Sequence, residues 1–211
     1  MWPGCIEFRQ IIAEAVEVLR GGGLVAYPTD TLYGLGAHAY LPVAVERVFA
    51  AKGRAVEKAL PLLLAREEDL ECVAADVPDR AWQLARAFWP GALTLVLRRG
   101  PPLPDVVVGG GPTVAVRVPH HAVPLALVAA LGAPITGTSA NRAGEPAPRL
   151  ASEVVAALGE EVDLVLDGGP CPGGVGSTVV DVTVHPPRIL RKGAVSEAEI
   201  AAVLEDIRLQ G

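Results

Sequence analysis

The fold class is decided by the stretch Gly21-Gly-Gly-Leu-Val-Ala-Tyr-Pro-Thr-Asp-Thr31. Before it, apolar residues recur at helical spacing from Phe8 to Leu19, and the run of glycines ends that helix. After the glycines, Leu24–Tyr27 is predicted to be a short buried strand that ends in cap and turn residues. A helix, a glycine stop and a strand in direct succession are typical of an α/β protein.

The same alternation of helix and strand continues along the chain. We expect helices at 43–51, 78–88, 123–131 and 152–158, and strands at 60–64, 93–97, 114–118, 164–166 and 179–182. A capping box from Ser196 to Glu199 announces a last helix. Thr31–Gly36 is predicted as a loop or helix start, and the Pro/Gly-rich segment Gly100–Pro112 as a mobile loop. The prediction is one α/β domain over residues 1–211 with an open mixed sheet.

Composition narrows the class of function. Hydrophobic residues make up 51% of the 211 residues and charged ones 20%, which is typical of a globular protein. The formal net charge of −6 disfavours broad binding to nucleic acid. No signal peptide and no membrane span are predicted, and Cys5, Cys72 and Cys171 form no CxxC pair. We therefore expect a cytoplasmic protein.

A cluster of cations stands out because lysine is rare in this chain. Lysine accounts for three of the 18 basic residues, and two of these flank an arginine to give Lys52, Arg54 and Lys58 between a helix end and a strand. Convergent cations at such a place can anchor a polyphosphate. The alternative is a solvated basic turn.

Three further segments carry polar groups that could bind an anion. Arg117 lies on the opposite face of its strand from Val116, where it needs a carboxylate or phosphate; the alternative is a structural salt bridge to Asp or Glu. Thr138–Asn141 and Ser177-Thr178 offer hydroxyl and amide groups, with ordinary capped turns as the alternative.

Common catalytic motifs are missing from the sequence. It contains no HExxH, no Gly-x-Ser-x-Gly elbow, no GxGxxG after a strand and no Walker A loop. Gly173–Thr178 lacks the lysine of a phosphate loop, and the four histidines show no metal-binding spacing. No nucleophile or histidine base is in evidence, so we expect catalysis by positioning and charge stabilisation.

Seven segments, in order along the chain, resemble the YrdC/Sua5 family of threonylcarbamoyl-AMP synthases. They are Tyr27-Pro-Thr-Asp-Thr-Leu-Tyr-Gly-Leu-Gly36, Lys52-Gly-Arg54 with Lys58, Phe88-Trp-Pro-Gly-Ala-Leu-Thr-Leu-Val96, Val114-Ala-Val-Arg117, Thr138-Ser-Ala-Asn141, Asp167-Gly-Gly-Pro with Gly176-Ser-Thr-Val-Val-Asp181, and Leu190-Arg-Lys-Gly193. The resemblance implies a twisted, open YrdC-like (RibB-like) sheet with a concave active site, in the short form without the extra C-terminal Sua5 domain.

The resemblance also implies an activity and a site. The enzyme would condense L-threonine, bicarbonate or CO2 and ATP to threonylcarbamoyl-adenylate and pyrophosphate, for the t6A37 modification of tRNA. Threonine would be held by Thr31, Arg117, the backbone near Gly137, and Ser177. The nucleotide would be held by Lys52, Arg54, Lys58, Thr113, Ser139, Asn141 and Arg191, with Lys52 and Arg54 supplying electrostatic catalysis. Mg²⁺ would accompany ATP, with Asp30 or Asp181 as candidate ligands.

Some positions depart from the family pattern. Ala55 and Ala59 replace prolines, Leu63 stands where a histidine is frequent, and Ala147 stands where a serine is frequent.

Two other functions are alternatives to the synthase. They are carbamoyl transfer, as in the related domain of hydrogenase-maturation proteins, and double-stranded RNA binding. Expected partners are a downstream tRNA threonylcarbamoyl transferase and, weakly, tRNA.

Overall fold

The computed structural model describes residues 5–54, 58–101, 103–204 and 208–209. Its α-helices are α1 (Cys5–Arg20), α2 (Pro42–Lys52), α3 (Asp79–Phe88), α4 (Asp105–Val108), α5 (Ala122–Leu131), α6 (Ala151–Leu158) and α7 (Glu197–Val203), with 3₁₀ turns η1 (Glu67–Cys72) and η2 (Gly159–Glu161). Its strands are β1 (Val25–Tyr27), β2 (Gly34–Gly36), β3 (Leu62–Leu63), β4 (Ala74–Ala75), β5 (Leu93–Arg99), β6 (Thr113–Arg117), β7 (Ile135–Thr136), β8 (Thr138–Ser139), β9 (Leu164–Val165), β10 (Thr178–Asp181), β11 (Arg188–Arg191) and β12 (Arg208–Leu209).

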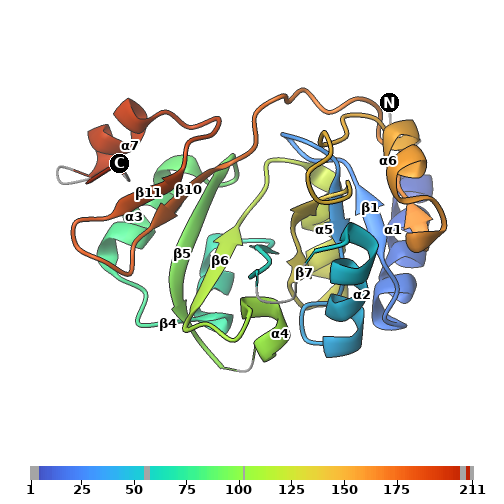
Figure 1. Cartoon of the computed structure of the whole chain (residues 1–211), viewed down its shortest axis with the longest axis horizontal. Coiled ribbons are helices and arrows are strands. Elements are labelled where there is room, and N and C mark those ends of the chain that lie inside the picture. The colour runs from blue at the N-terminus through green and yellow to red at the C-terminus, as the bar shows by residue number, and fades with distance from the viewer. Residues whose placement is uncertain (1–4, 55–57, 102, 205–207, 210–211) are drawn as a thin grey trace.

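The strands form two mixed sheets, which occupy the two halves of Figure 1. The smaller has the order β8-β2-β1-β9, and the larger β12-β11-β10-β5-β6-β3-β7, with β4 on β5. Thr136 joins them: its amide donates to Ala37 O at 3.0 Å, while its hydroxyl donates to Leu35 O and accepts from Ala37 N. The ends of strands from both sheets therefore meet near the middle of the molecule.

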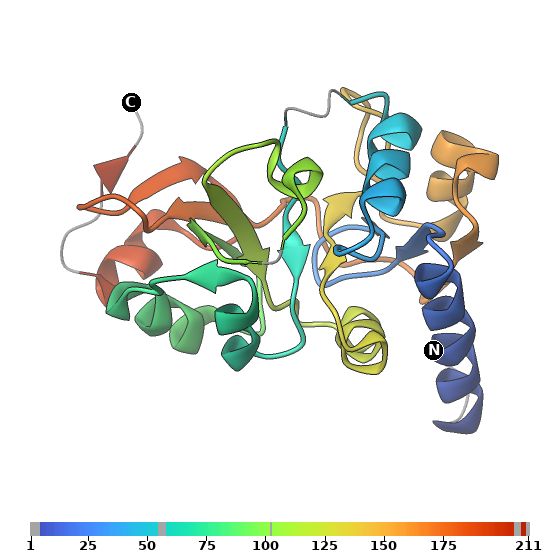
Figure 2. The ribbon, with the colours of Figure 1, turned by 90° about the horizontal axis from the view of Figure 1, so that it is seen from below.

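Helices cover the sheets at both ends of the molecule. Figure 2 shows α1 at one end and α3 with α7 at the other. Helix α1 buries Ile12 and Leu19 against α5, in a core that also contains Tyr27 and Leu63. This apolar stripe at helical spacing is the one that the sequence pattern predicts.

The end of α2 fixes the position of the cation cluster. Gly53 follows the helix in the left-handed conformation, with φ 58°, a geometry that glycine adopts without penalty. The Gly53 and Arg54 amides bond back to Ala50 O and Phe49 O, which satisfies the last helical carbonyls. The turn places Lys52 and Arg54 close together at the exit of a rigid helix.

Most predicted elements are confirmed, and two segments differ. Every predicted helix is present, including the last one, whose N-cap Ser196 accepts a hydrogen bond from Glu199 N. The end of Thr31–Gly36 is not a helix start, because Gly34–Gly36 pairs with β1 as strand β2. The expected loop Gly100–Pro112 contains helix α4, which buries Val107. The amide of Leu60 donates a hydrogen bond to Val107 O, so this segment is tied to the chain before β3.

In the described part of the chain, none of the helices is both long and apolar enough to cross a membrane.

Candidate active site

A cavity of about 600 Å³ lies where the two sheets meet. The smaller sheet contributes β2 and β8 residues and the loop after β1, and the larger sheet contributes residues of β3, β5, β6 and β11. The cavity thus depends on segments that are far apart in the sequence.

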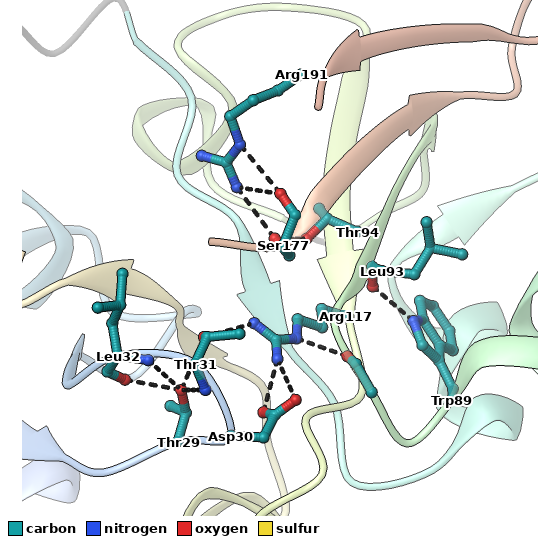
Figure 3. Close-up of polar contacts among 11 residues, drawn as sticks. Thr29, Asp30, Thr31, Leu32, Trp89, Leu93, Thr94, Arg117, Ser177 and Arg191 are labelled. Atoms are coloured by element: carbon teal, nitrogen blue, oxygen red, sulfur yellow. Dashed lines mark hydrogen bonds and ion pairs between the residues drawn. The ribbon is translucent and has the colours of Figure 1, made fainter. Parts of the chain in front are cut away.

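Arg117 forms the polar centre of one end, at the C-terminal end of β6 (Figure 3). Its Nε donates to Gly91 O at 2.7 Å, Nη1 donates to Thr31 Oγ1 at 3.3 Å, and Nη2 lies 2.6 Å from both carboxylate oxygens of Asp30. The side chain is 8% exposed. Burial lowers the pKa of Arg117, and the Asp30 charge opposes that shift. The salt bridge left open by the sequence is therefore present, and its acid is Asp30.

A tight turn presents Thr31 and Asp30 to this arginine. Thr29 Oγ1 accepts hydrogen bonds from the amides of Thr31 and Leu32 and donates to Leu32 O at 2.7 Å. Such side-chain bonds to the local backbone are what favour threonine in turns. Thr29 and Thr31 line the cavity, while Asp30 between them faces Arg117.

Ser177 and Thr94 add two hydroxyl groups to the same end. Their oxygens lie 2.7 Å apart, and both residues are buried. Arg191 donates to Ser177 O at 2.8 Å and to Ser177 Oγ at 3.0 Å, so it braces this segment (Figure 3). Neither neighbour of Ser177 is a base, which agrees with a site that has no serine nucleophile.

Lys52 and Asn141 form the other end. Lys52 Nζ donates to Ser139 O at 2.5 Å and to Asn141 O at 2.7 Å. Asn141 Nδ2 donates to Arg142 O and Glu145 O. Among the described residues, the buried atoms Arg54 Nε and Asn141 Oδ1 have no hydrogen-bond partner. One donor and one acceptor are thus left for a ligand.

The charge of the cavity is opposite to that of the protein. None of the described lining residues is Asp or Glu. Six lining residues are basic: Lys52, Arg54, Lys58, Arg117, Arg191 and Lys192. The whole chain nevertheless has a formal net charge of −6. Cations concentrated in one concave place attract an anionic ligand.

The structure brings together all but one of the predicted site residues. The cavity is lined by Thr31, Lys52, Arg54, Lys58, Arg117, Gly137, Ser139, Asn141, Ser177 and Arg191. Thr113 is the exception, because it stands at the opposite end of β6 from Arg117, about 13 Å along the strand. Its main chain pairs with Arg98. Its assignment to the nucleotide is therefore not supported by the described cavity lining.

Three of the four departures from the family pattern line this cavity. Ala59, Leu63 and Ala147 are lining residues, whereas Ala55 lies outside the described residues. Leu63 packs closely on the backbone of Gly137, where a Cβ atom would lie 2.7 Å from Leu63 Cδ2. The site is thus more apolar at this wall than the family pattern predicts.

Both acids considered as magnesium ligands accept hydrogen bonds from other residues of the protein. Asp30 pairs with Arg117, and Asp181 Oδ1 accepts from both the amide and the hydroxyl of Thr183. Within the described ranges, no group of three or more His, Cys, Asp or Glu is arranged to hold a metal ion. His38 and His121 each accept a backbone amide at Nδ1.

Sequence reasoning missed some of the lining residues. Thr94 and Lys192 lie inside the segments that carry the resemblance, but no role was assigned to them. Thr94 alternates with inward Leu93 and Leu95 on a strand buried on both faces, so no polarity pattern singles it out. The sequence also predicts Asp30 as a turn residue and a candidate metal ligand, and does not single it out as the partner of Arg117.

This arrangement matches one family of known proteins. A profile of the Sua5/YciO/YrdC family, described as telomere recombination, matches residues 17–193. The chain belongs to the Sua5/YciO/YrdC family. The threonylcarbamoyl-AMP synthase of Pyrococcus abyssi is 44% identical over 195 residues, and that of Alkalilimnicola ehrlichii is 38% identical over 193 residues. The crystal structure of P. abyssi Sua5 complexed with L-threonine superposes with a TM-score of 0.92 and 43% identity.

The coverage of these family members differs. The two sequence matches each take in 92% of this chain, but they span 57% of the P. abyssi protein and 94% of the A. ehrlichii protein. The structural match takes in 94% of this chain and 58% of P. abyssi Sua5. The chain thus spans little more than half of its archaeal relative. The YrdC-like fold predicted from the sequence is confirmed.

Proposed function

We propose that this protein is a threonylcarbamoyl-AMP synthase. It condenses L-threonine, bicarbonate or CO2, and ATP to threonylcarbamoyl-adenylate, with release of pyrophosphate. The observation that carries the proposal is the cavity lined by six cations and no described carboxylate, inside an acidic protein of this family. The synthase names of its relatives and the threonine complex of P. abyssi Sua5 support it.

The cation-rich end suits a nucleoside triphosphate. Arg54 and Lys58 are placed to neutralise phosphate oxygens, and a hydrogen bond to a charged group contributes about 1.5–3 kcal/mol. The unpartnered Arg54 Nε can donate to a phosphate, and Asn141 Oδ1 can accept from an adenine amine or a ribose hydroxyl. Lys52 holds the Ser139–Asn141 backbone and adds its charge.

The Arg117 end suits a small amino acid with a hydroxyl group. A guanidinium beside Thr31 can bind the carboxylate of threonine, and the Ser177 and Thr94 hydroxyls offer partners for its polar groups. Leu63 and Tyr27 supply apolar surface for its methyl group. The two predicted sets meet at Arg191, which is predicted for the nucleotide but contacts Ser177 at the Arg117 end.

The chemistry requires position and charge more than a protein nucleophile. The threonine amine attacks the carbon of CO2, and a proton leaves the nitrogen to give a carbamate. A carbamate oxygen then attacks the α-phosphorus of ATP, and the bond from that phosphorus to the bridging oxygen breaks as pyrophosphate leaves. The negative charge that develops on the leaving group is stabilised by Arg54, Lys58 and Lys52.

Mg²⁺ fits this scheme as part of the MgATP substrate. The described cavity lining offers no carboxylate ligand, and Asp30 is occupied by Arg117, so phosphate oxygens and water would supply its ligands. We place the enzyme in the cytoplasm, where a tRNA threonylcarbamoyl transferase consumes the adenylate. Direct tRNA binding is expected to be weak because of the net negative charge.

A pyrophosphate assay tests the proposal. Purified protein with MgATP, bicarbonate and L-threonine should release pyrophosphate, and omission of threonine should remove that release. Release that does not depend on threonine would contradict the proposal. L-2-Aminobutyrate in place of threonine is the matched substrate control, because it keeps the amine, the carboxylate and the methyl group and lacks only the hydroxyl group.

A further inference from the structure

Asp30 forms an ion pair with Arg117 but is not among the described residues that line the cavity. Its carboxylate is 15% exposed and the Arg117 side chain 8%. Thr29 and Thr31 on either side of Asp30 line the cavity, but Asp30 is not among the described lining residues. In Figure 3 the carboxylate lies against one edge of the guanidinium, while Thr31 lies against another.

The contacts of Arg117 use most of its hydrogen-bond donors. A guanidinium has five N–H groups in a fixed planar arrangement. Nε is used by Gly91 O, the two hydrogens of Nη2 face Asp30, and one hydrogen of Nη1 is used by Thr31 Oγ1. One N–H of Nη1 is left for a ligand in the cavity that Arg117 lines.

Without Asp30, the same guanidinium could turn about its side-chain torsions. Two uncharged acceptors, Gly91 O and Thr31 Oγ1, would still hold it, and Nη2 would lose both carboxylate oxygens that it contacts. A buried cation that has lost its counter-ion moves toward other acceptors or toward water. The turn that carries Asp30 is itself fixed by three hydrogen bonds of Thr29 Oγ1, so the carboxylate is a rigid support.

We propose that Asp30 is a positioning residue for substrate binding. By holding Nη2, it sets the plane of the Arg117 guanidinium so that the remaining N–H of Nη1 receives the carboxylate of the amino acid. Asp30 touches no substrate and binds no metal in this scheme. The inference rests on the proposed function, because it concerns the amino acid that Arg117 binds.

The test compares Asp30→Asn with a matched loss of another aspartate–arginine pair. Asp163 and Arg47 lie 2.9 Å apart away from the cavity, and Asp163 also accepts the Leu24 amide. Asp163→Asn therefore removes one ionic partner in the same protein without touching the site. KM for threonine, KM for ATP, kcat and thermal unfolding are measured for both variants and for wild type.

We expect Asp30→Asn to raise the threonine KM about tenfold or more, the loss expected for one charge-assisted hydrogen bond. The ATP KM should change less than about twofold, and Asp163→Asn should leave both values unchanged. Asp30→Glu keeps the negative charge and should restore part of the threonine affinity. In a double-mutant cycle, Arg117→Lys should make a further Asp30→Asn change nearly silent.

Three results would overturn the inference. The first is a folded Asp30→Asn variant with the wild-type KM for threonine. The second is a variant in which the KM values for threonine and ATP rise equally. The third is a variant whose melting temperature falls while both KM values stay unchanged. If Asp30→Asn does not fold, Asp30→Glu and the calorimetric affinity for L-threonine decide the question. A wild-type protein that binds no threonine would instead refute the proposed function, so the two failures are distinguishable.

Discussion

Lys52 Nζ donates a hydrogen bond of 2.7 Å to the carbonyl oxygen of Asn141, 89 residues away in the sequence. A second bond of 2.5 Å goes to Ser139 O, and Lys52 O accepts the amide of Ala143. Lys52 therefore ties the end of α2 to the segment after β8. The ammonium group therefore fixes the backbone of Ser139 and Asn141, and its charge adds to the positive charge of the cavity.

The titration of Lys52 gives a prediction about stability. Burial, with a smaller contribution from the Arg54 charge, lowers the pKa of Lys52 to about 8 in the folded protein. Between about pH 8 and pH 10 the unfolded chain then holds more protons, so Lys52 contributes stability that rises with pH. Below pH 8 both states are charged and this contribution is constant.

The measurement is urea unfolding of wild type and Lys52→Met from pH 7 to pH 9.5. As the pH rises above about 8, the free energy of unfolding of the wild type should increase relative to that of the variant. A constant difference across the whole range would contradict the shifted pKa.

Arg117 and Arg54 should affect the two substrates differently. Arg117→Ala should raise the threonine requirement more than the ATP requirement, because Arg117 lies beside Thr31. Arg54→Ala should do the reverse, because Arg54 stands beside Lys52 and Lys58 at the other end. Each effect should be about tenfold or more on the affected KM. Steady-state kinetics with each substrate varied checks this, and equal effects on both would remove the division of the site.

Thr94→Val should weaken threonine binding with little loss of fold. The change keeps the shape of the side chain but leaves Ser177 Oγ without its 2.7 Å partner. We expect the threonine KM to rise several-fold. Thr183→Val is the control, because its hydroxyl bonds to Asp181 outside the cavity. If the two valine variants behave alike, the Thr94 hydroxyl has no role in the site.

Gly173→Ala should disturb the loop that leads to β10. A Cβ atom at Gly173 would lie 1.6 Å from Thr31 O, so the loop must move away from the Thr31 turn. We expect lower stability, by about 1–3 kcal/mol, and a higher threonine KM. At Gly176 the nearest atom to an added Cβ is 3.6 Å away, so Gly176→Ala should keep the melting temperature. Equal melting temperatures for both variants would contradict the close approach.

Local sequence patterns predict the helices of this protein well. Helix α1 has an uninterrupted apolar stripe and a glycine stop, and α7 has the Ser196–Glu199 capping box. The signals and the structures they specify lie within a few residues of each other. Such elements need no knowledge of the rest of the chain.

The smaller sheet, β8-β2-β1-β9, could not be predicted in the same way. Strands β2 and β8 are short and rich in glycine or hydroxyl residues, so they have no apolar alternation. They form because β2 pairs with β1 on one side and β8 on the other. Pairing between distant segments leaves no local pattern.

The sequence predicts many of the residues that line the cavity, but not which of them contact one another. Arg117 needs a partner on physical grounds alone, but the identity of that partner depends on a contact across 87 residues. The sequence therefore allows Asp30 a magnesium-binding role, whereas in the structure its carboxylate is paired with Arg117. Thr113 shows the converse, since a residue next to the matching motif Val114–Arg117 is not among the described lining residues of the cavity.

The most direct test of the central claim follows the carbon atom of the product. The protein is incubated with MgATP, L-threonine and ¹³C-bicarbonate, and the adenylate product is analysed by mass spectrometry. We predict a threonylcarbamoyl-adenylate that carries a single ¹³C and is absent when threonine is omitted. Pyrophosphate release with no labelled adenylate, or an adenylate without the label, would contradict the account.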